Sequence, residues 1–120
     1  MSLAGFSLQS KTALVLGASS AIGRAAALAL AEAGADVAVS TTLVTQREEL
    51  ALKECKEKIH ALGKKSFAQT IDAAREADVQ TLITRTVSEL GRLNILVNAH
   101  DLPFAKPFAD ITPKEWQRVL

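Results

Sequence analysis

A phosphate-binding turn is predicted between positions 13 and 36, where the chain reads ALVLGASSAIGRAAALALAEAGAD. A short apolar run is followed by a turn of small residues and then by a long helical pattern. A helix that follows a strand in this way leaves its first backbone N–H groups unpaired, and these groups attract phosphate. Gly17 lets the chain turn sharply off the strand, and Gly23 lets the helix lie close to the sheet. The alternative is a tight connection that binds nothing.

This turn resembles the T-G-x-x-x-G-x-G segment of the short-chain dehydrogenase/reductase family and reads Leu16-Gly17-Ala18-Ser19-Ser20-Ala21-Ile22-Gly23 here. The resemblance implies that the turn contacts the pyrophosphate of a nicotinamide dinucleotide through Gly17, Ser19, Ser20, Ala21, Ile22 and Gly23. Two positions depart from the family pattern. Leu16 replaces a threonine at the strand end, without expected consequence. Ala21 replaces the middle glycine and puts a methyl group where the main chain and the pyrophosphate come closest, so we expect lower affinity but an intact turn.

The resemblance continues over nearly the whole chain and implies further cofactor contacts. Asp72, with Ala73 beside it, matches the acidic residue that hydrogen-bonds the adenine amino group; the alternative is an aspartate that caps the next helix. Asn98 matches the first asparagine of the family's N-N-A-G segment, which steadies the sheet and lines the adenosine ribose. Here the segment reads Asn98-Ala99-His100-Asp101, so that histidine and aspartate replace small residues near the cofactor channel.

The pair His100 and Asp101 is not predicted to be an acid/base or metal site. Adjacent residues rarely present their side chains to one point, and no second histidine or carboxylate cluster lies at ligand spacing. We expect both side chains to turn aside or to narrow the site. His60 lies on the solvated side of a charged helix, and Cys55 lies on an apolar stripe typical of a core residue. We therefore predict no metal site.

The choice of cofactor depends on the end of the second predicted strand. Asp36 directly follows Gly34-Ala35 and so begins that strand, remote from the ribose. The strand ends at Ser40-Thr41-Thr42, where no carboxylate is available to bind a 2′-hydroxyl group or to repel a 2′-phosphate. Contacts from Thr41, Thr42 or Arg47 would suit a phosphate. The sequence therefore favours NADP slightly over NAD.

No catalytic residue is predicted in this chain. The family's chemistry resides in a serine and a Tyr-x-x-x-Lys pair, and the sequence contains no tyrosine. The family's catalytic asparagine also belongs just beyond Leu120. We expect the 120-residue chain alone to be inactive.

Composition indicates one ordinary α/β domain, with 48% hydrophobic and 22% charged residues. A formal net charge of +1 with interspersed signs gives no sign of binding to nucleic acid or to an anionic membrane. The single cysteine excludes an internal disulfide and fits a reducing compartment, and no targeting segment is evident, so a cytoplasmic location is expected.

Hydrophobic periodicity predicts alternating strands and helices. We expect strands at residues 12–16, 37–39, 66–71 and 93–97, and helices at about 21–33, 44–62 and 74–90. Glycine follows each helix, at positions 34, 63 and 91. This alternation indicates a doubly wound parallel sheet (Rossmann-like) with strand order 3-2-1-4, and it puts the turn at residues 17–23 at the switch point where such sheets bind ligands.

The helical patterns also predict which side chains face the sheet. In the first helix the expected inward face is Ile22, Ala26, Leu30 and Ala33. In the second helix it is Leu52, Cys55, Ile59 and Leu62. In the third helix it is Val79, Leu82, Ile83, Val87 and Leu90.

The last residues predict one more helix. Thr112-Pro113-Lys114-Glu115 is a capping box with proline at the first helical position, followed by Trp116 and Val119. Barely two turns fit before Leu120. We interpret residues 1–120 as the N-terminal part of a single larger domain. In the resembled family the matching helix packs against a second subunit, so a homodimer or homotetramer is expected for the complete protein.

The leading functional hypothesis is the cofactor-binding half of an NAD(P)-dependent oxidoreductase that acts on a small carbonyl or alcohol. The second is a non-catalytic nucleotide-binding module. It would be a degenerate relative whose departures at Ala21, His100 and Asp101 reflect a loss of catalytic activity. Other doubly wound proteins, such as sugar-nucleotide enzymes or methyltransferases, are disfavoured because Asp72 and Asn98 fit an adenine dinucleotide in the short-chain arrangement.

Overall fold

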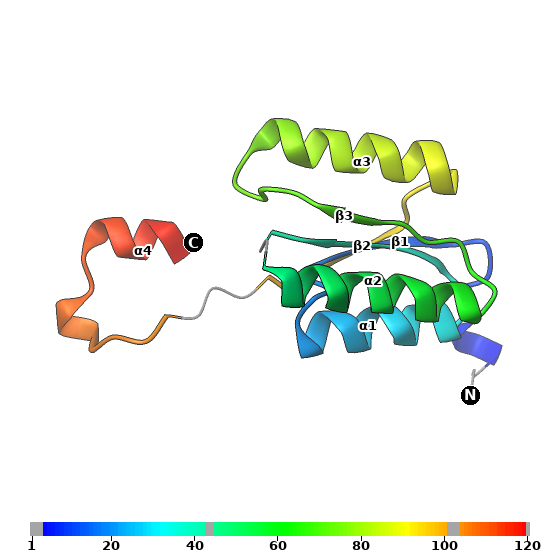
Figure 1. Ribbon diagram of the computed structural model, residues 1–120, viewed down its shortest axis with the longest axis horizontal. Coiled ribbons are helices and arrows are strands. Elements are labelled where there is room, and N and C mark those ends of the chain that lie inside the picture. Colours follow the sequence, from blue (N-terminus) through cyan, green and yellow to red (C-terminus); the bar gives the residue numbers. More distant parts are fainter. Residues whose placement is uncertain (1–3, 43–44, 101–103, 120) are drawn as a thin grey trace.

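The computed structural model describes residues 4–42, 45–100 and 104–119. Four parallel strands form one sheet in the order β3-β2-β1-β4, as the sequence predicts (Figure 1). The strands are β1 (Thr12–Leu16), β2 (Asp36–Thr41), β3 (Ala68–Thr70) and β4 (Ile95–Asn98). Crossovers between parallel strands place the helices on the faces of the sheet.

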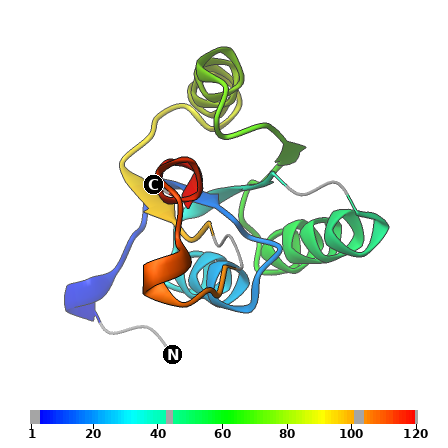
Figure 2. The same ribbon diagram turned by 90° about the vertical axis from the view of Figure 1, so that its left-hand side faces the viewer.

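Helices cover both faces of the sheet, which makes the fold doubly wound. The helices are α1 (Ala21–Glu32), α2 (Gln46–Ala61), α3 (Glu76–Leu90) and α4 (Pro113–Val119), with short 3-10 turns η1 (Ala4–Phe6) and η2 (Phe108–Asp110). Figures 1 and 2 show α1 and α2 on one face and α3 on the other. Within the described residues, no helix combines the length and apolar character that a membrane crossing needs.

The central strand β1 contributes to two separate cores because its side chains alternate between the faces. Ala13 and Val15 pack into the core under α1 and α2, and Leu14 packs into the core under α3. Val37 and Val39 of β2 join the first core. This double burial explains why the strand sequences are almost continuously apolar.

The helix faces differ partly from the predicted ones. The buried residues of α1 are Gly23, Ala27 and Ala31. The predicted inward face is confirmed for Leu30, which packs against the first core, and is wrong for Ile22, which is 79% exposed. Residues 23, 27 and 31 are all small, so the face of α1 that carries them lets the helix backbone come close to the sheet. Ile22 lies next to this face, in the first turn of the helix. In α2 the prediction is confirmed for Leu52, Cys55 and Ile59 and is wrong for Leu62, which is exposed.

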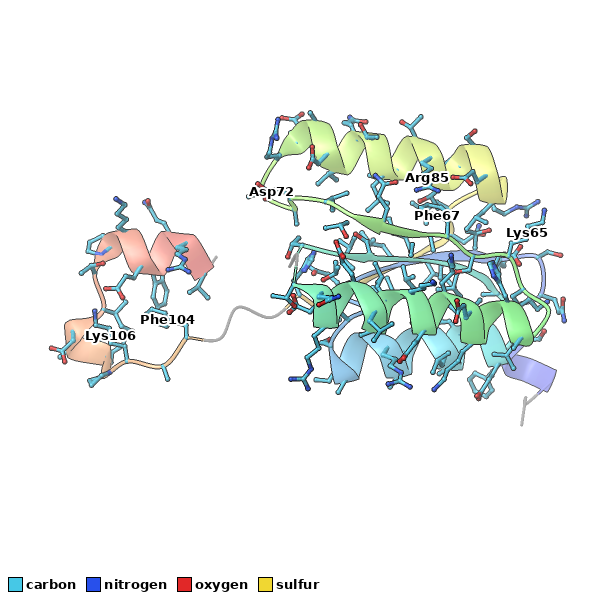
Figure 3. All side chains as sticks on the ribbon, viewed as in Figure 1. Lys65, Phe67, Asp72, Arg85, Phe104 and Lys106 are labelled. Atoms are coloured by element: carbon cyan, nitrogen blue, oxygen red, sulfur yellow. The ribbon has the colours of Figure 1, made fainter. Side chains whose placement is uncertain are left out.

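One flank of α3 is more open than the pattern suggests. Leu82, Thr86 and Leu90 are buried, whereas Ile83 and Val87 are exposed. Ile83 and Val87 each follow a buried residue by one position and therefore lie on the side of α3 away from Arg85. The Arg85 guanidinium lies 4.1 Å from the centre of the ring of Phe67, which comes just before β3 (Figure 3).

The C-terminal segment projects from the sheet in Figure 1. Its predicted capping box is confirmed: the Thr112 Oγ1 accepts a hydrogen bond from the Glu115 main-chain N–H at 3.2 Å, and a Glu115 carboxylate oxygen accepts from the Thr112 N–H at 3.3 Å. The same carboxylate pairs with the Lys106 ammonium at 2.8 Å. These bonds explain why the pKa of Glu115 is lowered.

Candidate functional site

The turn between β1 and α1, here called the phosphate turn (residues 17–23), is held by one serine. The Ser20 hydroxyl is the N-cap of α1: it accepts from the Gly23 N–H at 3.1 Å and donates to the Gly17 carbonyl at 2.8 Å. The Gly17 and Ala18 N–H groups both donate to the Ser40 carbonyl of β2 at 2.9 Å. The turn is therefore fixed to β2 as well as to β1, from which it continues. The Ser20 hydroxyl holds the turn and the first turn of α1 together.

Three main-chain N–H groups of the phosphate turn are left for a ligand. The amides of Ser19, Ala21 and Ile22 have no hydrogen-bond partner within the part of the chain that the structure describes. Ala21 and Ile22 are the first two residues of α1, where the helix dipole adds positive potential. This arrangement suits an anion such as a phosphate group.

The two glycines of the turn are required by close main-chain contacts. Gly17 has a φ of +80°, and a Cβ built there would lie 2.5 Å from the Ala99 carbonyl oxygen and 2.8 Å from the His100 nitrogen. A Cβ at Gly23 would lie 2.2 Å from the Gly17 carbonyl oxygen. Gly17 therefore permits the sharp turn as predicted. Gly23 allows α1 to begin against the turn itself.

The end of β2 is linked to the phosphate turn. The Thr41 and Ser19 hydroxyls lie 2.8 Å apart and share a hydrogen bond, and Thr41 is buried. Thr42 follows it and is half-buried. Asp36 begins β2, where its carboxylate accepts from the Lys65 N–H at 2.8 Å, so its predicted distance from this site is confirmed. Figure 3 shows Lys65 and Asp72 at opposite ends of the sheet.

A groove runs beside the turn between α1 and the start of α2. One part of it, about 350 Å³, is lined by Ser19, Arg24, Arg47 and Glu54 among others, and an adjoining part of about 560 Å³ is lined by Ser19, Arg47 and Glu48 among others. Neither arginine forms an ion pair with a carboxylate of the described residues. Arg24 was not predicted as a site residue from the sequence. Its position one turn after Ser20 is the feature that could have identified it.

The loop after β3 places Asp72 at the same edge of the sheet. Its Oδ1 accepts from the Ala74 N–H at 3.0 Å, and its N–H donates to the Asp78 carboxylate at 2.9 Å. The N-cap of α3 is Arg75, so the alternative that Asp72 caps this helix is wrong; Asp72 closes a turn that precedes it. Asp72 is exposed and Ala73 is half-buried against the second core. Recognition of adenine stays a prediction.

The exit of β4 lies against the phosphate turn. Asn98 pairs in register with Leu16, and the Ala99 N–H donates to the Leu16 carbonyl at 2.8 Å. The Asn98 side-chain oxygen accepts from the His100 N–H at 3.2 Å. Asn98 thus braces the segment that covers Gly17.

His100 is half-buried, and burial lowers the pKa of its imidazole. Its Nε2 is buried and has no hydrogen-bond partner in the described chain. Asp101 lies outside the described residues, so the expected arrangement of the pair remains a prediction.

The other two candidate reactive side chains lie away from this edge. Cys55 is fully buried in the first core, and burial raises the pKa of its thiol. A thiol in that state is a poor nucleophile, as the core interpretation predicts. His60 is exposed on α2, and its Nε2 lies 3.1 Å from the Ser66 carbonyl oxygen.

Comparison with known proteins identifies the family of this arrangement. The family model for short chain dehydrogenase matches residues 11–120. The short chain dehydrogenase/reductase AstE of Aspergillus oryzae is 39% identical over 96% of this chain and 43% of its own length. A short-chain type dehydrogenase/reductase from Mycobacterium marinum is 32% identical with a TM-score of 0.82, over 95% of this chain and 44% of that chain.

A second solved structure agrees in fold. A short chain dehydrogenase from Mycobacterium paratuberculosis bound to NAD superposes with a TM-score of 0.83 at 24% identity, over 93% of this chain and 44% of that chain. The chain spans less than half the length of each of these three proteins. Because the family model matches all but the first ten residues, the chain belongs to the short-chain dehydrogenase family of oxidoreductases.

Proposed function

We propose that this chain supplies the cofactor-binding half of an NAD(P)-dependent oxidoreductase that acts on a small carbonyl or alcohol substrate. The observation that supports this most is the phosphate turn at the switch point of the sheet, where three N–H groups without a partner among the described residues suit an anionic ligand. Family membership supplies the reaction class. A nicotinamide ring bound there would accept or donate the hydride.

The residues present fit a dinucleotide. The amides of Ser19, Ala21 and Ile22 would hold the pyrophosphate, and Asp72, with Ala73 beside it, would hold the adenine over the end of β3. Asn98, Ala99 and His100 would line the cofactor on the β4 side of the turn. The Ala21 methyl group lies at the start of α1, and the turn forms with it in place.

The end of β2 supports a preference for NADP. Arg24 and Arg47 line the groove beside Ser19 without ion-pair partners among the described residues, and guanidinium groups bind phosphate well. The β2 strand ends in Thr41, which is not a carboxylate that would bind the 2′-hydroxyl of NAD. Glu48 and Glu54 line the same groove, which keeps the preference modest.

Catalysis requires residues that this chain does not contain. The sequence has no tyrosine, so the family's Tyr-x-x-x-Lys pair must come from elsewhere, and the 120-residue chain alone is inactive under this proposal. Assembly of the complete protein into a homodimer or homotetramer and a cytoplasmic location are part of the same proposal. A non-catalytic nucleotide-binding module remains the second candidate because Ala21 departs from the family's middle glycine.

Calorimetric titration of the intact protein with NADPH and NADH tests the proposal. We expect both to bind, with NADPH the tighter ligand, and Arg47→Ala to weaken NADPH about tenfold or more while leaving NADH nearly unchanged. Ala21→Gly should leave the affinity unchanged or improve it. Absence of binding by either ligand would refute the proposal, and tighter binding of NADH would refute the NADP preference. Binding without turnover of any carbonyl or alcohol would favour the non-catalytic module.

A further inference from the structure

The end of β2 fixes the phosphate turn at consecutive residues. The N–H groups of Gly17 and Ala18 both donate to the Ser40 carbonyl at 2.9 Å. The next residue of each segment continues this contact, because the Ser19 and Thr41 hydroxyls lie 2.8 Å apart and share a hydrogen bond. The last two residues of β2 therefore hold the first three residues of the turn.

Ser19 depends on this side-chain bond more than its neighbours do. The following residue, Ser20, is fixed by its main chain, since its N–H donates to the Gly17 carbonyl at 3.1 Å. The Ser19 N–H has no partner in the described chain and is one of the three amides left for an anion. Among the described residues, the bond to Thr41 is the single hydrogen bond of Ser19.

Thr41 lies behind Ser19 as seen from the groove. Side chains alternate along a strand, so Thr41 is on the same face of β2 as Val37 and Val39, toward α1 and α2. Thr41 is buried and lines neither part of the groove, whereas Ser19 is half-buried and lines both parts. A ligand in the groove would therefore meet Ser19, and Thr41 would act on it through Ser19.

We propose that Thr41 is a positioning residue whose hydroxyl fixes Ser19, so that the Ser19 N–H is oriented before the pyrophosphate of a dinucleotide binds. The inference rests on the proposed function, because it presupposes a dinucleotide at the turn. A donor that is already ordered loses less conformational freedom on binding, which raises the affinity. This role serves NAD and NADP alike, in place of the direct contact with a 2′-phosphate that the sequence suggests for Thr41.

Calorimetric titrations of the intact protein with NADPH and NADH test this role. Thr41→Val removes the hydroxyl and keeps a β-branched side chain, and it should weaken both ligands by the same factor, about 3- to 10-fold. Thr41→Ser keeps a hydroxyl and should retain most of the affinity. Thr86→Val is the matched control, because it removes a buried hydroxyl that donates to the Leu82 carbonyl at 2.8 Å within α3, on the other face of the sheet. It should bind both ligands as the parent does.

A double-mutant cycle shows whether Thr41 acts through Ser19. Thr41→Val should cost no further affinity in the Ser19→Ala background, where the bond is already absent. In ¹⁵N relaxation measurements without ligand, the order parameter of the Ser19 N–H should fall in Thr41→Val and stay unchanged in Thr86→Val. Thr41→Ala removes the same hydroxyl, should give the same results and replaces Thr41→Val if that variant does not fold.

The outcomes separate this inference from the proposed function. If the parent binds NADPH or NADH and the folded Thr41 variant without a hydroxyl binds it equally well, the inference is wrong and the proposed function stands. A larger loss for NADPH than for NADH, or an added loss in the Ser19→Ala background, would indicate direct contact of Thr41 with the ligand and would also overturn the inference. So would an equal loss in Thr41→Ser or in Thr86→Val. If the parent binds neither ligand, the proposed function and the inference both fail.

Discussion

Gly17 combines a left-handed backbone with a crowded position, and the two costs can be separated. An L-residue at a φ of +80° costs about 1–2 kcal/mol, and at Gly17 the new Cβ would also lie 2.5 Å from the Ala99 carbonyl oxygen. Gly63 has the same φ of +80° with nothing within 4 Å of the added Cβ. We therefore expect Gly17→Ala to lower the free energy of unfolding by about 2 kcal/mol or more beyond Gly63→Ala, measured by urea denaturation. Equal losses in the two variants would show that the exit of β4 does not crowd the turn.

His100 predicts a pH dependence of stability. Burial lowers the pKa of the folded imidazole below its unfolded value of about 6.5. Between these two pKa values the unfolded chain binds more protons, so the free energy of unfolding rises with pH in that window. The contribution is complete above about pH 6.5 and is lost as the pH falls through the folded pKa.

Denaturation of the parent and of His100→Gln between about pH 5 and pH 8 measures this contribution, since glutamine does not titrate. The parent should lose stability more steeply below about pH 6.5 than the variant does. Parallel curves for the two proteins would mean that His100 has the same pKa in the folded and unfolded chains.

Sequence reasoning predicted residues for the candidate site but few of their contacts. The positions of Gly17, Ser20 and Asn98 follow from local pattern and from resemblance. The Ser20 hydroxyl bonds lie within the turn itself. That the His100 Nε2 is buried without a hydrogen-bond partner among the described residues depends on how β4 lies against β1. That arrangement is set by contacts more than 80 residues apart, such as the Thr12 N–H to the Asn94 side chain. A single sequence does not report such pairs.

At the scale of elements, strand order and helix starts were predictable and helix faces were less so. Alternating strands and helices with right-handed crossovers predict a doubly wound parallel sheet, and the expected order 3-2-1-4 is confirmed. The inward face of α1 could not be predicted by hydrophobicity, because the requirement there is small size: Gly23, Ala27 and Ala31 are buried while Ile22 is exposed. β2 also runs to Thr41, two residues beyond the apolar run, and the Thr41 hydroxyl shares a hydrogen bond with the Ser19 hydroxyl there.

The start of α2 is a capping box that was not predicted from the sequence. The Thr45 hydroxyl accepts from the Glu48 N–H at 3.3 Å, and the Glu48 carboxylate accepts from the Thr45 N–H at 3.3 Å. Thr45→Ala should lower the free energy of unfolding by about 1 kcal/mol because an N-terminal amide of the helix loses its partner. Thr81→Ala, at an exposed position inside α3, should be neutral or slightly stabilising in the same denaturation experiment. A larger loss at Thr81 than at Thr45 would contradict the capping role.

At the scale of the whole molecule, apolar surface is open on the β4 side of the sheet. Leu96 of β4 is 60% exposed and Val87 on the flank of α3 is 46% exposed. In the projecting C-terminal segment, Trp116 of α4 is 53% exposed. An open strand edge beside such surface favours association. We therefore expect the isolated 120-residue chain to associate in light-scattering measurements, and Leu96→Lys to reduce that association. A dilute, strictly monomeric chain that unfolds cooperatively would show that residues 1–120 form a complete domain.

Amide NMR of the intact protein decides whether the turn between β1 and α1 binds the phosphates of a dinucleotide. On titration with NADPH, the largest ¹H–¹⁵N shifts should occur at Ser19, Ala21 and Ile22, whose N–H groups have no partner in the described chain. Lys65, at the opposite end of the sheet, should not shift and serves as the internal control (Figure 3). Saturable binding that leaves the three turn amides unmoved, or that shifts Lys65 and its neighbours instead, would contradict the phosphate-binding role of this turn.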